Sequence, residues 1–156
     1  MFDDLRELYQ EVILDHGRNP RNFRHANNAT CSAHGNNPIC GDTLVVYLCL
    51  DDDGVIEDAA FQGQGCAISV ASASMMTEIL KGKTKAEAER LFSAFHKMCT
   101  SGDFDIAAAA ECDADAVERL QMLSGVREFP VRVKCATLAW HTMDAAVKGQ
   151  QDVSTE

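Results

Sequence analysis

Residues 43–62 read TLVVYLCLDDDGVIEDAAFQ, and this stretch decides the fold. In residues 43–50, leucine and valine recur at every second position, so one face of an extended strand is apolar. Asp53-Gly54 is a turn signal, and residues 55–62 then return as a second strand. The stretch therefore predicts a β-hairpin, in which two antiparallel strands are joined by a tight turn.

Helical patterns lie on both sides of this hairpin. Before it, apolar residues recur at helical spacing over residues 2–16. After it, residues 66–80 are rich in small side chains, which suits a helix packed closely inside the core. Two further helices are expected. One covers residues 84–99 and begins with a capping box, and the other covers residues 130–147, begins with proline and is apolar on nearly every side.

The order of these elements is typical of the α+β class. We predict a small antiparallel sheet of two to three strands, covered on one face by helices. The third strand would lie over residues 29–33, within a polar stretch that otherwise reads as loop. A length of 156 residues suits one domain. That domain is expected to span residues 1–148, with residues 81–129 as a helical insertion and residues 149–156 as a flexible tail.

Composition argues against several classes of function. The net charge of −10 repels nucleic-acid phosphates and anionic membrane surfaces. No apolar run approaches the length of a membrane span, and the first residues lack the pattern of a signal peptide. The seven cysteines are an odd number, which favours reduced thiols in a cytoplasmic setting over a disulfide framework. We therefore expect neither a nucleic acid nor a membrane as a partner.

Three cysteines and one aspartate stand where they could hold a metal ion. Cys40 and Asp42 flank Gly41 in the loop NNPICGD, so a sulfur and an oxygen can reach one point. Cys66 follows the glycine-rich QGQG and opens a helical pattern, where unpaired N–H groups favour a thiolate. Cys135 lies near the start of the last helix. Each cysteine alone also suits plain packing, but together they favour a metal site.

Two basic residues lie beside the third cysteine. Arg132 stands about one helical turn before Cys135, where it can share the sulfur's face and stabilise a thiolate, and Lys134 is adjacent to Cys135. Zinc takes four ligands drawn from Cys, His, Asp and Glu, and iron–sulfur clusters also prefer thiolates. Because no CxxC pair occurs, this site would be assembled by the fold and would not create it.

The remaining cysteines and histidines give weaker signals. Structural roles suffice for the cysteines at positions 31, 49, 99 and 112. None of the five histidines forms an HExxH or CxxCH motif. Only His34 lies close enough to the Cys40 loop in sequence to be considered as a further ligand.

These motifs resemble those of the IscU/NifU-like family of iron–sulfur cluster assembly proteins. The matching stretches are NPICGD at residues 37–42, GQGCAISVASASMM at 63–76 and FPVRVKCATLAW at 129–140. The N-terminal helix and the hairpin fit as well, so the resemblance covers most of the chain. It implies the family's fold and the family's ability to bind iron or an iron–sulfur cluster.

Three departures point to the SufU branch of that family. The residue before the third cysteine is Lys134, where the scaffold branch usually has histidine. That branch also carries a Leu-Pro-Pro-Val-Lys chaperone motif, which residues 129–134 do not reproduce. Finally, the segment between Cys66 and Cys135 is longer than in the scaffold branch by roughly one helix, that of residues 84–99.

Resemblance to the SufU branch implies a specific role. It implies that the resting protein holds zinc and accepts sulfur from a SufS-type cysteine desulfurase, alongside other Suf assembly proteins and apo iron–sulfur proteins. The implied zinc ligands are Cys40, Asp42, Cys66 and Cys135. We expect Cys40 to be the sulfur acceptor, because its loop has more room to move than the two helix-borne cysteines. The chain would then be a zinc-dependent sulfurtransferase-like acceptor rather than a stand-alone enzyme.

Three other functions stay open at this point. A true scaffold would build a [2Fe–2S] cluster on the same cysteines and pass it to apo-proteins. A zinc hydrolase of the deaminase kind would need His-x-Glu and Pro-Cys-x-x-Cys motifs, and the chain has neither. A purely structural metal or interaction domain would bind zinc without responding to a desulfurase.

Overall fold

The computed structural model describes residues 2–38, 41–100 and 114–154. The strands are β1 (Cys31–Asn37), β2 (Asp42–Leu50), β3 (Ile56–Gln64) and β4 (Asp152–Ser154). The helices are α1 (Phe2–Arg18), α2 (Ala67–Leu80), α3 (Lys85–Thr100), the 3-10 helix η1 (Gln121–Glu128) and α5 (Pro130–Val147). Residues 114–120 are also helical and lead into η1. Across these described segments, no helix is both long and apolar enough to cross a bilayer.

The hairpin forms as the sequence predicts. β2 and β3 pair in antiparallel fashion, with Val46 opposite Phe61. In the turn, the Asp51 carboxylate accepts the backbone N–H groups of Asp53 at 2.9 Å and Val55 at 2.8 Å. Aspartate therefore fixes the turn through its own side chain, which is a common role for this residue type.

The sheet is larger than expected, and it is mixed, with the order β3-β2-β1-β4. β1 has the polar sequence CSAHGNN, and its antiparallel pairing with β2, rather than its intrinsic propensity, makes it a strand. β4 comes from the segment expected to be a flexible tail, and it pairs parallel to β1 with His34 opposite Asp152. This corrects the expected sheet of two to three antiparallel strands: three strands are antiparallel, and the fourth is parallel.

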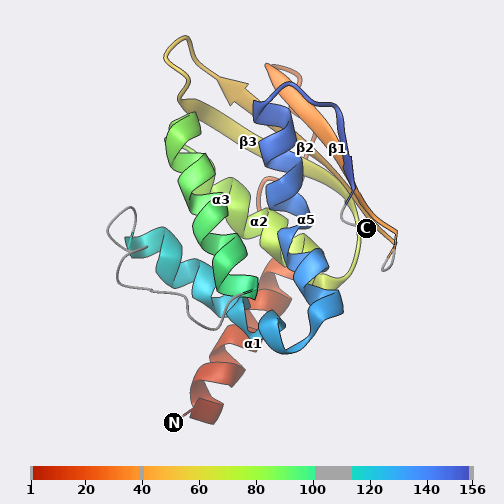
Figure 1. The fold of residues 1–156 in the computed structure, drawn as a ribbon, viewed down its shortest axis with the longest axis vertical. Helices are drawn as coiled ribbons and strands as arrows, with labels where there is room; N and C mark the ends of the chain where they lie inside the picture. The colour runs from red at the N-terminus through yellow and green to blue at the C-terminus, as the bar shows by residue number, and fades with distance from the viewer. Residues whose placement is uncertain (1, 39–40, 101–113, 155–156) are drawn as a thin grey trace.

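The helices cover one face of the sheet (Figure 1). α5 packs on β1 and β2, α2 packs on β3 and α5, and α3 packs on α5. The largest side chains of this core include Phe61, Leu138 and Trp140, all fully buried. α5 comes so close to β1 that a Cβ on Gly35 would lie 1.9 Å from Thr142 Oγ1. Glycine at position 35 thus lets the helix that carries Cys135 lie directly on the sheet.

His16 links α1 to α2 through a side-chain hydrogen bond. Its Nδ1 lies 2.7 Å from Ser74 Oγ, which also accepts the backbone N–H of Arg21 at 2.8 Å. Burial lowers the pKa of His16 below its usual range, so the imidazole is neutral in this contact at neutral pH. The contact fixes α2, the helix that Cys66 precedes.

α3 belongs to the stretch expected to be a helical insertion. Its predicted capping box is present: the Glu87 N–H donates to Thr84 Oγ1, and the Thr84 N–H donates to Glu87 Oε1, each at 3.1 Å. Phe95 of α3 packs against Trp140 of α5, with 5.4 Å between ring centroids. α3 therefore contributes to the main core.

Candidate metal centre

Three of the four predicted ligands converge although they are far apart in sequence. Asp42 begins β2, Cys66 immediately precedes α2, and Cys135 lies in the second turn of α5. One ligand atom from each side chain, a carboxylate oxygen or a Sγ, lies within 4.8 Å of the others. In the described part of the chain, no other set of three Cys, His, Asp or Glu side chains meets this condition.

Asp42 is held from two sides and is fully buried. Its Oδ1 accepts the backbone N–H of Cys66 at 2.9 Å, and its Oδ2 accepts an N–H of Asn37 Nδ2 at 3.3 Å. A Cβ on Gly65 would lie 2.6 Å from Asp42 Oδ1, so only glycine leaves room for the carboxylate there. Gly65 is the second glycine of the QGQG stretch, so this motif leaves room for the carboxylate beside Cys66.

Cys66 stands at the N-cap of α2 with an extended backbone, φ −70° and ψ 166°. Its side chain makes no capping hydrogen bond and is half-buried. The sulfur therefore lies beside the positive end of the α2 dipole while remaining available to a ligand. The helix-start position predicted for this cysteine is confirmed.

Cys135 is fully buried under the site. Its Sγ lies 3.8 Å from the carbonyl oxygen of Val131 one turn earlier and 3.7 Å from Asn37 Nδ2. Asn37 thus donates to both Asp42 and Cys135 and ties two of the three ligands together. Sequence reasoning missed this role of Asn37, although the residue opens the NPICGD motif; its place opposite Asp42 in the β1–β2 pairing was the missing information.

The chemistry of the three side chains suits a metal cation. Two thiols and a carboxylate match the donor set that zinc prefers, and ligands of one tetrahedral zinc lie about 3 to 4 Å apart. Asp42 is buried, and no described lysine or arginine forms an ion pair with it. Asn37 Oδ1 is also buried without a hydrogen-bond partner in the described structure. A buried carboxylate without a countercharge is costly, and a bound cation would remove that cost.

The other predicted site residues do not belong to the three-residue group. Cys40 lies outside the described residues. Arg132 is exposed in the first turn of α5, and Lys134 is half-buried next to Cys135. His34 is exposed on β1 and is not part of the three-residue group.

The remaining described cysteines lie outside the three-residue group. Cys49 and Cys99 are buried. Cys31 is half-buried, and its burial raises the pKa of the thiol, which keeps it protonated and unreactive at neutral pH. Their expected structural roles agree with these positions, and Cys112 lies outside the described residues.

Comparison with known proteins places these features in a family. Residues 8–109 match the family model described as NifU-like N terminal domain. The chain is 39% identical over 148 residues to the Bacillus subtilis protein named zinc-dependent sulfurtransferase SufU, covering 95% of each chain. It is also 39% identical over 144 residues to the Streptococcus pyogenes protein named iron-sulfur cluster assembly scaffold protein IscU, covering 92% of this chain and 85% of the other.

Solved structures agree with this relationship. One, from Fervidobacterium islandicum, is titled a putative iron-sulfur cluster assembly scaffold protein for the SUF system. It is 33% identical, has a TM-score of 0.77 and covers 90% of this chain and 97% of its own. The N-terminal NifU-like protein of Brucella abortus is 21% identical with a TM-score of 0.75, covering 92% and 94%, which shows a shared fold.

Proposed function

The chain belongs to the IscU/NifU family of iron–sulfur cluster assembly proteins, and we propose that it binds one zinc ion at the centre described above and accepts persulfide sulfur from a SufS-type cysteine desulfurase. The observation that carries this proposal is the convergence of Asp42, Cys66 and Cys135, with their ligand atoms within 4.8 Å of one another. The similarity to a relative named as a zinc-dependent sulfurtransferase supports the same choice.

Four side chains make up the proposed zinc site: Cys40, Asp42, Cys66 and Cys135. Cys40 follows from the sequence motif, and the other three also from their geometry. Bound zinc would hold the three sulfurs as thiolates at neutral pH. Asp42 supplies a hard oxygen to a borderline-soft ion, so it is the weakest partner of the set and favours an exchangeable site. With three thiolates and one carboxylate, the formal charge of the site is −2, and Arg132 and Lys134 lie at the start of α5 to offset it.

Sulfur transfer is a thiol exchange in which electrons balance without an added oxidant. The Cys40 thiolate attacks the terminal sulfur of the desulfurase cysteine persulfide. A new S–S bond forms on Cys40, the old S–S bond breaks, and the desulfurase cysteine leaves as a thiolate. Cys135 is fully buried and Cys66 stands at the N-cap of a helix. Cys40, which the sequence predicts to lie in a loop, is therefore the better acceptor.

The acceptor is tested by mixing persulfide-loaded SufS-type desulfurase with Cys40→Ser and, as the matched comparison, with Cys31→Ser. We expect Cys31→Ser to take up sulfane sulfur as the wild type does and Cys40→Ser to take up none, measured by mass spectrometry of the acceptor chain. Undiminished sulfur uptake by Cys40→Ser would remove this residue from the mechanism. A parallel test of Cys66→Ser shows whether zinc binding is needed for the transfer.

Replacing Asn37 with alanine is expected to lower zinc affinity by roughly 10- to 100-fold, which is the usual cost of losing a residue that orients metal ligands. The reason is that Asn37 Nδ2 donates to both Asp42 Oδ2 and Cys135 Sγ. Competition with a chromophoric chelator measures the change. Asn36→Ala is the control, because Asn36 is the exposed neighbour on the same strand. Equal affinities of the two variants would contradict the orienting role of Asn37.

A second candidate function is a scaffold that builds a [2Fe–2S] cluster on the same cysteines. It is favoured by the relative named as an IscU scaffold, which is as similar in identity as the sulfurtransferase relative. Anaerobic reconstitution with iron and sulfide followed by absorption spectroscopy separates the two. A stable cluster would support the scaffold, whereas zinc retention with desulfurase activation would support sulfur transfer.

A further inference from the structure

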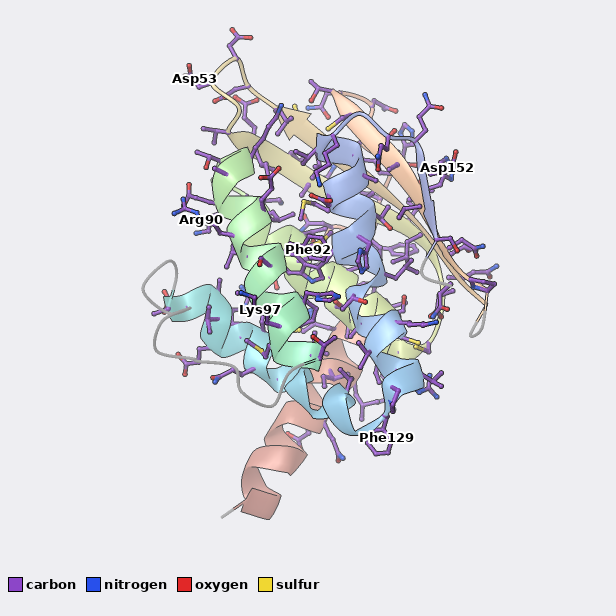
Figure 2. All side chains as sticks on the ribbon, in the orientation of Figure 1. Asp53, Arg90, Phe92, Lys97, Phe129 and Asp152 are labelled. Atoms are coloured by element: carbon purple, nitrogen blue, oxygen red, sulfur yellow. The ribbon has the colours of Figure 1, made fainter. Side chains whose placement is uncertain are left out.

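Two histidines face each other between α3 and α5, away from the three-ligand centre. The ring centroids of His96 on α3 and His141 on α5 are 5.8 Å apart, with an angle of 83° between the ring planes. Phe92, one turn before His96, packs edge-on to both, at 6.2 Å from His96 and 4.9 Å from His141. Figure 2 labels Phe92 on α3, next to α5. Phe92 therefore contacts both imidazoles and packs beside the pair.

We propose that His96 and His141 form a second, exchangeable site for a divalent transition-metal ion such as Zn²⁺, which bridges α3 to α5. The site joins α3 to α5, the helix that carries Cys135. It is built from different side chains and does not depend on the function proposed for the three-ligand centre.

The ring separation suits a shared ion. With a metal–nitrogen bond of about 2.1 Å, two imidazoles on one ion at angles near tetrahedral have centroids roughly 5 to 6 Å apart. The observed 5.8 Å falls in this range. Imidazole nitrogen is a good ligand for zinc, nickel and copper.

Both imidazoles have nitrogen atoms to offer. No hydrogen bond joins either ring to another described residue. Both side chains are at least partly exposed, so water and ions can reach them. His96 is exposed and His141 is half-buried. Burial, and next the nearby His96, lower the pKa of His141, so its ring is neutral at neutral pH and its lone pair is available to a metal.

Asp144 adds a negative charge near the pair. It lies one turn after His141 on α5, close enough to favour positive charge on that ring, and it also pairs with Lys148 at 2.9 Å. Water would complete the coordination, because the described residues supply no third ligand within reach of both rings. A site with two protein ligands exchanges its ion more readily than one with four, so it binds more weakly than the proposed zinc centre.

The test counts zinc ions per chain. Untagged protein of residues 1–156 is dialysed against Zn²⁺ at pH 7.5, and bound zinc is measured by mass spectrometry of the element. We expect two ions for the wild type, one each for His96→Gln and His141→Gln, and one for Cys66→Ser. The control His34→Gln removes an exposed histidine of β1 and keeps both ions. Saturation of the wild type at one ion, or an unchanged second ion in both histidine variants, would overturn the proposal.

The thermal midpoint distinguishes an ion that bridges α3 and α5 from one bound nonspecifically at the surface. In the Cys66→Ser background, Zn²⁺ should raise the thermal midpoint, because an ion held only by the folded chain stabilises it. Adding His141→Gln should remove that shift. A midpoint that rises equally in the double variant would show that the ion does not join α3 to α5.

Discussion

Cys66→Ser is expected to abolish zinc binding at the three-ligand centre while leaving the metal-free fold intact. Serine does not ionise at neutral pH, so one thiolate ligand is lost. Removing a residue that merely orients ligands costs 10- to 100-fold in affinity, and losing a ligand should cost roughly 100-fold or more. Sulfur acceptance should fall with the zinc content if the proposed function holds.

In the metal-free protein, the same substitution should leave the stability of the fold unchanged or raise it. Cys66 is the N-cap of α2, with φ −70° and ψ 166° and no side-chain hydrogen bond to the helix. Serine is a preferred N-cap residue, and a good cap contributes about 0.5 to 2 kcal/mol. The metal-free Cys66→Ser protein should therefore unfold at an equal or higher urea concentration than the metal-free wild type.

Metal analysis and urea unfolding in the presence of a chelator measure both effects. Cys31→Ser is the matched control, because Cys31 is half-buried on β1 and belongs to no ligand group in the described structure. It should retain zinc. Full zinc content in Cys66→Ser would contradict the proposed ligand set. A strongly destabilised metal-free variant would contradict the N-cap argument.

Gly65→Ala is expected to lower zinc affinity by about 10- to 100-fold through Asp42 alone. The new Cβ would lie 2.6 Å from Oδ1 and 3.1 Å from Cγ of Asp42, too close for either atom to stay in place. Gly65 does not have a left-handed φ, so backbone strain is not the cause. The carboxylate must turn away and lose the Cys66 N–H bond of 2.9 Å. A hydrogen bond to a charged group is worth roughly 1.5 to 3 kcal/mol.

A double-mutant cycle tests whether the effect acts through Asp42. In the Asp42→Ala background, Gly65→Ala should cost little further affinity, because the carboxylate that it displaces is already absent. Gly125→Ala is the control, since a Cβ there meets no atom within 4 Å. Additive losses from Gly65→Ala and Asp42→Ala would show that the glycine acts by another route.

Local patterns were enough to predict much of this fold. The hairpin follows from alternation and an Asp-Gly turn, and the start of α3 follows from the Thr84/Glu87 box. β4 could not be derived in this way, and β1 was expected only in part, at residues 29–33 instead of Cys31–Asn37. Their residues are polar, and they are strands because each pairs with a neighbour that lies far away in sequence or on the other side of a loop.

In the metal centre, too, some features follow from local sequence and others only from tertiary packing. The positions of Cys66 at a helix start and of Cys135 early in the last helix are local facts, and the sequence predicts both. Their approach to Asp42 depends on how α2 and α5 pack on the sheet, which no local pattern encodes. The role of Asn37 also depends on tertiary structure, because its amide reaches Asp42 and Cys135 only once β1 is paired with β2.

Zinc X-ray absorption spectroscopy measures the proposed zinc ligands directly. The sample is protein purified without chelators and adjusted to one zinc per chain, so that only the tighter site is filled. We expect three sulfur ligands at about 2.3 Å and one oxygen at about 2.0 to 2.2 Å. In Cys66→Ser, the sulfur signal should be lost together with the zinc of the three-ligand centre. A first shell of only oxygen and nitrogen, or four sulfurs without oxygen, would contradict the ligand set of Cys40, Asp42, Cys66 and Cys135.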